Sequence, residues 1–206
     1  MPRKTDKRVR LIEAAMILIH QQSFNLTTLA DIAHKADVPL GNVYYYFKKK
    51  EDIGEAVIEK LAAIYSELLK HLESIAITPL DRMKALLKHT VSTENLEQVA
   101  RYGCQVGGLC EELSKQGGPL ADSAAKLLHD LLQWSESQFN SMGCGSESSN
   151  FALSFIASIQ GTYLLTHTFK DPQFSIRQTE MLLEWLHKIK SKYQVATEIS
   201  QEEAFA

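Results

Sequence analysis

Residues 28–50, TLADIAHKADVPLGNVYYYFKKK, decide the fold of this chain. The stretch predicts a short apolar helix, a three-residue turn and a second short helix that carries three consecutive tyrosines. Two short helices joined by a tight turn form the geometry that places the second helix in the major groove of DNA. Three lysines follow, and cations at this point suit contact with phosphates. The stretch therefore predicts a helix-turn-helix that binds double-stranded DNA.

Charge is divided unevenly along the 206 residues. Residues 1–50 hold nine Lys and Arg against four Asp and Glu, a net charge of +5, whereas the remaining residues hold 13 against 21, a net charge of −8. A basic segment followed by an acidic one favours an anionic partner that binds at one end. A basic face that is merely solvated is the alternative, and the helix-turn-helix pattern among the cations argues against it.

Helical periodicity continues along nearly the whole chain, with few alternating segments of the β type. We predict an all-α fold of about nine helices, in which a three-helix head is joined by a long fourth helix to a helical body. Thr28 with Asp31 predicts a capping box at the start of the second helix. Beyond the head, helices are expected at residues 50–74, 79–95, 109–116, 119–142, 150–169 and 175–193.

Several classes of site and location are disfavoured by the composition. No run of 18 or more apolar residues is present, and no apolar signal core follows the charged N-terminus, so we expect a cytoplasmic protein with no membrane partner. Cys104, Cys110 and Cys144 are too few for a disulfide framework and match no zinc spacing. They are expected to be thiols, and neither a metal nor a cofactor is expected.

At this point the chain resembles the TetR family of one-component transcription regulators. The resemblance covers about residues 8–60 and is carried by Ile12, Ala15, Phe24, Thr28-x-x-Asp31-Ile32-Ala33, Ala36-x-Val38, Gly41-x-Val43-Tyr44-x-Tyr46-Phe47 and Lys50-Glu51. The body matches in helix count and length, and its Gly103-Cys104 is similar to a subset with a Gly-Cys pair before the sixth helix. The chain departs from the family at Asp37, where glycine is usual, and at Tyr46, where histidine is common. Asp tolerates a left-handed backbone, so we expect the turn to survive.

The resemblance implies a division of labour along the chain. Residues 1–50 are expected to be the DNA-binding domain, residues 51–195 the ligand-binding and dimerisation domain, and residues 196–206 a disordered tail. A homodimer is expected to bind an inverted-repeat operator and to be released when a small-molecule ligand binds in the body. Dimerisation is assigned to helices 8 and 9, residues 150–169 and 175–193, because both are apolar on more than one face.

Eight residues are the candidates for DNA contact. Thr28 caps a helix whose free amides favour an anion, and Asn42 and Leu40 have side chains that can pair with adenine or touch a thymine methyl group. The resemblance assigns phosphate contacts to Tyr44 and Lys50. The full set is Thr28, Leu40, Gly41, Asn42, Tyr44, Tyr45, Tyr46 and Lys50. Packing in the core is the alternative for one of the tyrosines.

Helices 5 to 8 are expected to line the ligand pocket, and the candidate lining residues are His89, Cys104, Gln105, Trp134, Phe139, Met142, Tyr163 and His167. Each has a place in an ordinary core as its alternative. Cys104 follows Gly103 close to an expected helix start, where amide dipoles favour a thiolate. A repressor that senses oxidants or electrophiles through Cys104 is therefore the alternative to one that binds a small molecule.

Two other function classes receive little support from the sequence. A cysteine-dependent enzyme using Cys104 with His89 or His167 is the remote alternative, but no nucleophile elbow, metal box or phosphate loop is present, so we expect no enzyme. An interaction protein that has lost DNA binding is disfavoured by the presence of Thr28, Tyr44 and Lys50. The operator, the ligand and the choice between repressor and activator stay open.

Overall fold

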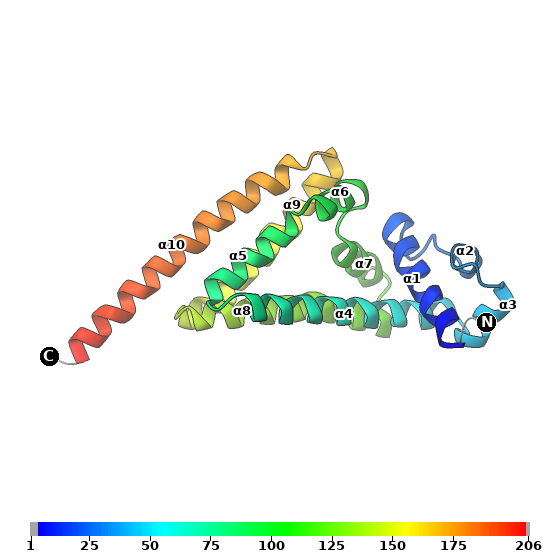
Figure 1. Ribbon diagram of the computed structural model, residues 1–206, viewed down its shortest axis with the longest axis horizontal. Coiled ribbons are helices and arrows are strands. Elements are labelled where there is room, and N and C mark those ends of the chain that lie inside the picture. Colours follow the sequence, from blue (N-terminus) through cyan, green and yellow to red (C-terminus); the bar gives the residue numbers. More distant parts are fainter. Residues whose placement is uncertain (1–3, 205–206) are drawn as a thin grey trace. The chain divides into compact units, whose positions relative to one another are not determined.

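All the secondary structure in the described residues is helical (Figure 1). The computed structural model describes residues 4–204, and side chains from 6 to 193. Its helices are α1 (Lys4–Gln22), α2 (Leu29–Lys35), α3 (Leu40–Tyr46), α4 (Lys50–Ile75), α5 (Pro79–Thr90), α6 (Thr93–Tyr102), α7 (Gln105–Ser114), α8 (Pro119–Ser141), the 3-10 helix η1 (Gly145–Glu147), α9 (Ser148–Phe169) and α10 (Gln173–Ala204). The all-α prediction is confirmed over this range. None of the described helices is long and apolar enough to cross a membrane.

The chain forms two compact units. The first contains the residues up to 66 together with residues 105–128, and the second contains residues 67–104 together with the residues from 129 on. Helices α4 and α8 contribute residues to both units. The expected division after residue 50 is a division of function and stays a prediction. The compact units instead group α7 with the first three helices.

The first unit is built on apolar residues from five of its helices. Phe24, between α1 and α2, is buried, and a methyl group at Gly54 of α4 would lie 2.8 Å from its Cε2 atom. A side chain at this position of α4 would therefore have to displace the buried ring. The buried side chains of the unit include Leu11, Ile12, Ala15, Ile32, Val43, Phe47, Ile53, Val57, Leu61, Leu109 and Leu113.

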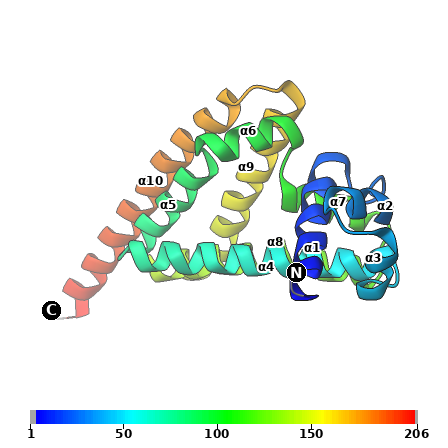
Figure 2. The ribbon, with the colours of Figure 1, turned by 45° about the vertical axis from the view of Figure 1, so that its right-hand side comes forward.

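The second unit has an aromatic core. The ring of Phe139 from α8 lies 5.6 Å from the ring of Phe151, 6.3 Å from that of Phe155 and 5.7 Å from that of Trp185 (centroid distances). Phe139 and Phe155 have no exposed surface. Figure 2 shows α9 and α10 running beside each other and α5 beside α10. Aromatic pairs at these separations add to the free energy gained by burial.

The structure differs from the sequence expectation at two helix boundaries. The single helix expected at 79–95 is two helices, α5 and α6, because Val91 leaves the helical conformation and the Ser92 side chain then caps α6 by accepting from the Asn95 amide. The helix expected to begin at residue 109 begins at Gln105, so that Gly107 and Gly108 lie inside α7.

The C-terminal segment also differs. Helix α10 continues to Ala204, where the sequence favoured a disordered tail from residue 196. Its last turns contain Ala, Glu and Gln, which are good helix formers. Residues 205 and 206 of the expected tail lie outside the described residues.

Candidate nucleic-acid interface

Helix α2 begins with the capping box that the sequence predicts. The Asp31 amide donates to Thr28 Oγ1 at 3.1 Å, and the Thr28 amide donates to Asp31 Oδ2 at 2.9 Å. The Thr28 hydroxyl donates to the same carboxylate oxygen at 2.7 Å, and these bonds lower the pKa of the Asp31 carboxyl. The Thr28 hydroxyl thus both donates and accepts within the capping box, and its contact with DNA stays a prediction.

The turn between α2 and α3 is supported by Arg10, which is not among the predicted site residues. Asp37 takes the expected left-handed conformation, with φ of 50°. The Arg10 guanidinium donates to the carbonyls of Ala36 and Asp37, the latter at 2.9 Å, and lies 3.3 Å from the Asp37 carboxylate. Arg10 therefore holds the turn in which Asp replaces the usual glycine. The missing glycine was the signal that such a support was needed.

Helix α3 presents one exposed face and buries the other. Leu40, Tyr44 and Tyr45 are 42%, 49% and 59% exposed, whereas Val43 and Phe47 on the other face are buried. A methyl group added at Gly41 would meet nothing within 4 Å, so the protein itself has room for a side chain there. A bare backbone at this position allows a partner to approach closely.

Two of the predicted contact residues lie beside this face. Asn42 and Tyr46 are half-buried, and the Tyr46 ring packs edge-to-face against Tyr45 with centroids 5.0 Å apart. At 100° per residue, Asn42 lies about 160° around the helix from Leu40 and Tyr44 but only about 60° from Tyr45. The base-reading role of Asn42 stays a prediction, at the edge of the exposed face.

The three lysines after α3 have different partners. Lys48 Nζ donates to the Tyr44 carbonyl at 2.8 Å, and the amides of Lys48 and Lys49 donate to Asp52 Oδ2. Lys50 Nζ donates to the Asn25 carbonyl at 2.9 Å, and burial lowers the pKa of the Lys50 ammonium. Lys50 thus begins α4, as predicted, and its ammonium group is held by the Asn25 carbonyl.

Most of the candidate pocket residues are not brought together, but Cys104 lies close enough to Tyr163 to act on its phenol by charge, and the His167 ring lies beside Gly103. His89 is exposed, while Phe139 and Met142 are buried in the core. Gln105 belongs to the first unit, where its Nε2 donates to the Met16 carbonyl at 3.3 Å. In the second unit, Trp134 Nε1 donates to Glu73 at 2.9 Å, His167 Nδ1 lies 3.3 Å from the Ala100 carbonyl, and half-buried Cys104 directly precedes α7.

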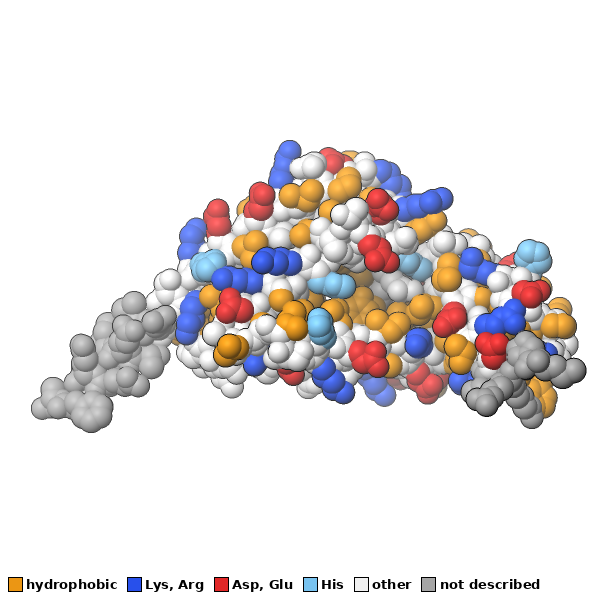
Figure 3. Space-filling view, viewed as in Figure 1, with side chains coloured by type: hydrophobic (Ala, Val, Ile, Leu, Met, Phe, Trp, Pro, Cys, Tyr) orange, Lys and Arg blue, Asp and Glu red, His pale blue; other side chains and the backbone are white. Residues whose placement is uncertain are grey.

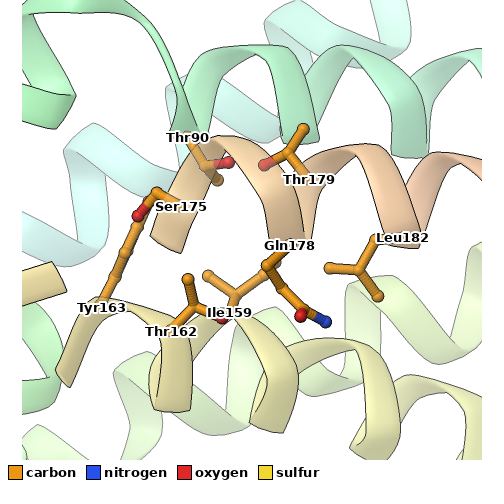
Figure 4. A pocket seen from close by; sticks show the side chains of 8 residues that line it. All are labelled: Thr90, Ile159, Thr162, Tyr163, Ser175, Gln178, Thr179 and Leu182. Atoms are coloured by element: carbon orange, nitrogen blue, oxygen red, sulfur yellow. The ribbon is translucent and has the colours of Figure 1, made fainter. Parts of the chain in front are cut away.

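Of the candidate pocket residues, Tyr163 lines a small cavity (Figure 4). The cavity has a volume of about 10 Å³, which is room for about one water molecule. Asn95 Nδ2 donates to the Tyr163 hydroxyl at 3.0 Å, and burial raises the pKa of that phenol. The sequence did not predict the other lining residues as a pocket, and the hydroxyls of the Thr and Ser side chains among them were the only signal. These lining residues are Thr90, Ile159, Thr162, Ser175, Gln178, Thr179 and Leu182.

Charges of both signs are interspersed on the face of the protein drawn in Figure 3, with hydrophobic side chains between them. No broad patch of one sign stands out in that view. The case for an anionic partner rests on the excess of cations in residues 1–50 and on the exposed face of α3.

Comparison with known proteins identifies the same region. Residues 11–57 match the model of the family described as bacterial regulatory proteins, tetR family. An uncharacterised HTH-type transcriptional regulator of Lactococcus lactis is 27% identical over 169 residues, which are 81% of this chain and 86% of that protein. The HTH-type transcriptional repressor NemR of Escherichia coli is 31% identical over 112 residues. The match covers 54% of this chain and 54% of NemR, about half of each.

A solved structure matches the fold over more of the chain. The crystal structure of the reduced form of E. coli NemR superimposes with a TM-score of 0.76 at 22% sequence identity and covers 85% of this chain and 96% of that one. At this identity the likeness shows the fold, while the helix-turn-helix match and the sequence relatives carry the family. Residues 11–57 thus match the DNA-binding part of the TetR family, and the chain is a DNA-binding transcriptional regulator.

Proposed function

We propose that this chain is a homodimeric repressor that binds an inverted-repeat operator through α3 and is released when a small molecule binds in the body. The observation that carries the proposal is the exposed face of α3, where Leu40, Gly41, Tyr44 and Tyr45 are accessible to solvent while Val43 and Phe47 are buried. Side chains of this kind at the start of a second helix suit contacts with base edges and phosphates.

Dimerisation is proposed through α9 and α10. Helix α9 contains no Asp, Glu, Lys or Arg over its 22 residues, yet Leu153 and Leu164 are 59% and 65% exposed. A methyl group at Gly161, on the same side, would meet nothing within 4 Å. An uncharged helix with one face in the core and a second apolar face exposed suits a symmetry mate. On this proposal the outer residues of α9 form the seam, and Phe155 and Ile159 stay in the protomer core.

Repression is supported by the relatives. NemR is named a transcriptional repressor, and the other relative is named a transcriptional regulator. The names of these relatives also favour a protein that is not an enzyme.

The first experiment measures binding of the purified protein to the DNA upstream of its own gene and to scrambled DNA of equal length, at several salt concentrations. Tighter binding to the native DNA, with an affinity that falls steeply as salt rises, supports a specific regulator. Equal and weak binding to both, followed by no enrichment from a random DNA library, would contradict the proposal.

A redox-controlled repressor is the second candidate, and the placement of the three thiols favours Cys104 as its sensor. Cys144 is buried, and that burial raises its pKa, while the Cys110 thiol donates to the Ala124 carbonyl at 3.1 Å. Cys104 is half-buried at the start of α7. Mild oxidant should release DNA from the wild type and leave the Cys104→Ser complex intact; equal release from both would exclude this candidate.

A further inference from the structure

The turn at Phe24 and Asn25 in the first unit is hydrogen-bonded to side chains that are distant in sequence. The amides of Phe24 and Asn25, which follow α1, donate to the two carboxylate oxygens of Glu112 in α7, each at 2.7 Å. Gln116 Nε2 donates to Asn25 Oδ1 at 2.9 Å. A carboxylate that accepts hydrogen bonds from two backbone amides fixes the orientation of those amides. Glu112 and Gln116 together therefore hold the conformation of this turn.

The same turn holds Lys50. The Asn25 carbonyl accepts from Lys50 Nζ at 2.9 Å, and the ammonium lies 4.6 Å from the centre of the Phe24 ring. Glu112 also acts on Lys50 by its charge, which favours the ammonium form against the effect of burial. Asn25 is thus bonded at its amide, its carbonyl and its side chain by Glu112, Lys50 and Gln116 respectively.

We propose that Glu112 is a positioning residue for DNA binding. It holds the Phe24–Asn25 turn, and the turn holds the Lys50 ammonium where a phosphate is to be met. The inference rests on the proposed function, in which Lys50 contacts the DNA backbone. The negative charge of Glu112 is not expected to repel the DNA phosphate, because the carboxylate accepts hydrogen bonds from two amides and lies close to the Lys50 ammonium.

The decisive experiment is a double-mutant cycle on the full-length protein, measured on the DNA duplex that the wild type prefers. Glu112→Gln keeps the shape of the side chain but leaves one amide without its acceptor. It is expected to weaken DNA binding about tenfold, as the loss of a hydrogen bond to a charged group does. The dependence of affinity on salt should become shallower, as in Lys50→Gln.

Because Glu112 acts through Lys50, the double variant should bind no more weakly than Lys50→Gln alone. Glu111→Gln is the matched control: it removes the same charge from the neighbouring position of α7, where Glu111 pairs with Lys115, and it should bind as the wild type does. Losses that add in the double variant, or a Glu112→Gln protein that equals the control, would overturn the inference.

Two further results can be told apart from a direct effect of Glu112 on DNA binding: loss of folding, and failure of the proposed function itself. If Glu112→Gln unfolds by circular dichroism, the exposed Gln116→Ala variant decides: a smaller loss of affinity with the same change in salt dependence supports the inference, and unchanged binding overturns it. A wild-type protein that binds no DNA would overturn the proposed function together with this inference. A wild type that binds DNA but is indifferent to Glu112 would overturn the inference alone.

Discussion

Helices α3 and α9 both expose large apolar side chains, but the chemistry around these side chains differs. On α3, Tyr44 and Tyr45 carry hydroxyls and are followed by three lysines, whereas α9 exposes Leu153 and Leu164 on a helix without a single Asp, Glu, Lys or Arg. Exposure alone therefore does not name a partner. Hydroxyls and cations suit phosphates and bases, while an uncharged aliphatic face suits a second protein surface.

The largest expected effect comes from placing a charge on the α9 face. Leu164→Arg should dissociate the proposed dimer, because an uncompensated buried charge costs roughly 3–5 kcal/mol and an isologous seam contains it twice. Sedimentation equilibrium measures the change. Ile77→Arg, at a 93% exposed position outside the helices, is the control and should stay dimeric. A dimeric Leu164→Arg protein would place the seam elsewhere.

The inner face of the same helix is expected to act on folding. Phe155 has no exposed surface and packs against Phe139, so Phe155→Ala should lower the free energy of unfolding by about 3–5 kcal/mol. Urea unfolding measures it at fixed protein concentration, since a dimer's stability depends on concentration. A loss below about 1 kcal/mol would show that the aromatic core can collapse around the cavity.

On α3, Asn42 tests whether a half-buried residue beside the exposed face reads sequence. Asn42→Ala should relax the preference at one base position, by roughly 1–3 kcal/mol if the contact is bidentate. Binding to a set of single-base operator variants measures this. Asn140→Ala, an exposed asparagine of α8, should change nothing. An equal loss on every sequence would reject the reading role of Asn42.

Tyr44 is expected to act on all sequences alike. Tyr44→Phe removes a hydroxyl that the family resemblance assigns to a phosphate, and affinity should fall by about 1 kcal/mol on operator and scrambled DNA. Titration against both duplexes measures the ratio. A loss confined to the operator would make Tyr44 a reader of bases, and the distinction between the roles of Asn42 and Tyr44 would disappear.

The smallest effect concerns pH and the second unit. Burial raises the pKa of Tyr163, so the folded state favours the neutral phenol. The unfolded chain releases this proton near pH 10. The contribution to stability is therefore complete below about pH 10 and is lost as pH rises toward the raised pKa. Between pH 9 and 11 the melting temperature should fall less steeply for Tyr163→Phe than for Tyr45→Phe, which is the exposed control. Identical slopes would show that Tyr163 does not contribute to the pH dependence of stability.

Much of the fold followed from patterns that span three or four residues. The capping box of Thr28 and Asp31, the start of α5 at Thr78 and Pro79, and the apolar stripe of α4 each depend on neighbours within one or two helical turns. Such signals are contained in the sequence itself. The α5–α6 break was missed because Val91 and Ser92 resemble ordinary helix residues until Ser92 is seen to cap a second helix.

The candidate sites divide in the same way. The exposed face of α3 was predictable, because Val43 and Phe47 mark the opposite side as buried. The pocket residues were chosen by type alone, and the structure separates some of them from the rest: His89 is exposed, and Gln105 bonds to α1. Cys104, Tyr163 and His167 do lie in one region of the second unit, and their role in binding a ligand stays a prediction. Side-chain chemistry does not reveal which helices meet, so a set drawn from several helices had no spatial basis.

The sequence by itself determined an all-α chain with a helix-turn-helix near its start, because periodicity, caps and a turn are local properties of the polypeptide. Only the tertiary structure decided that α7 meets the turn after α1, that Arg10 supports the left-handed Asp37, and that Asn25 carries Lys50. These contacts join residues between 25 and 88 positions apart. They depend on how the helices pack, which side-chain volume and burial determine together over a whole compact unit.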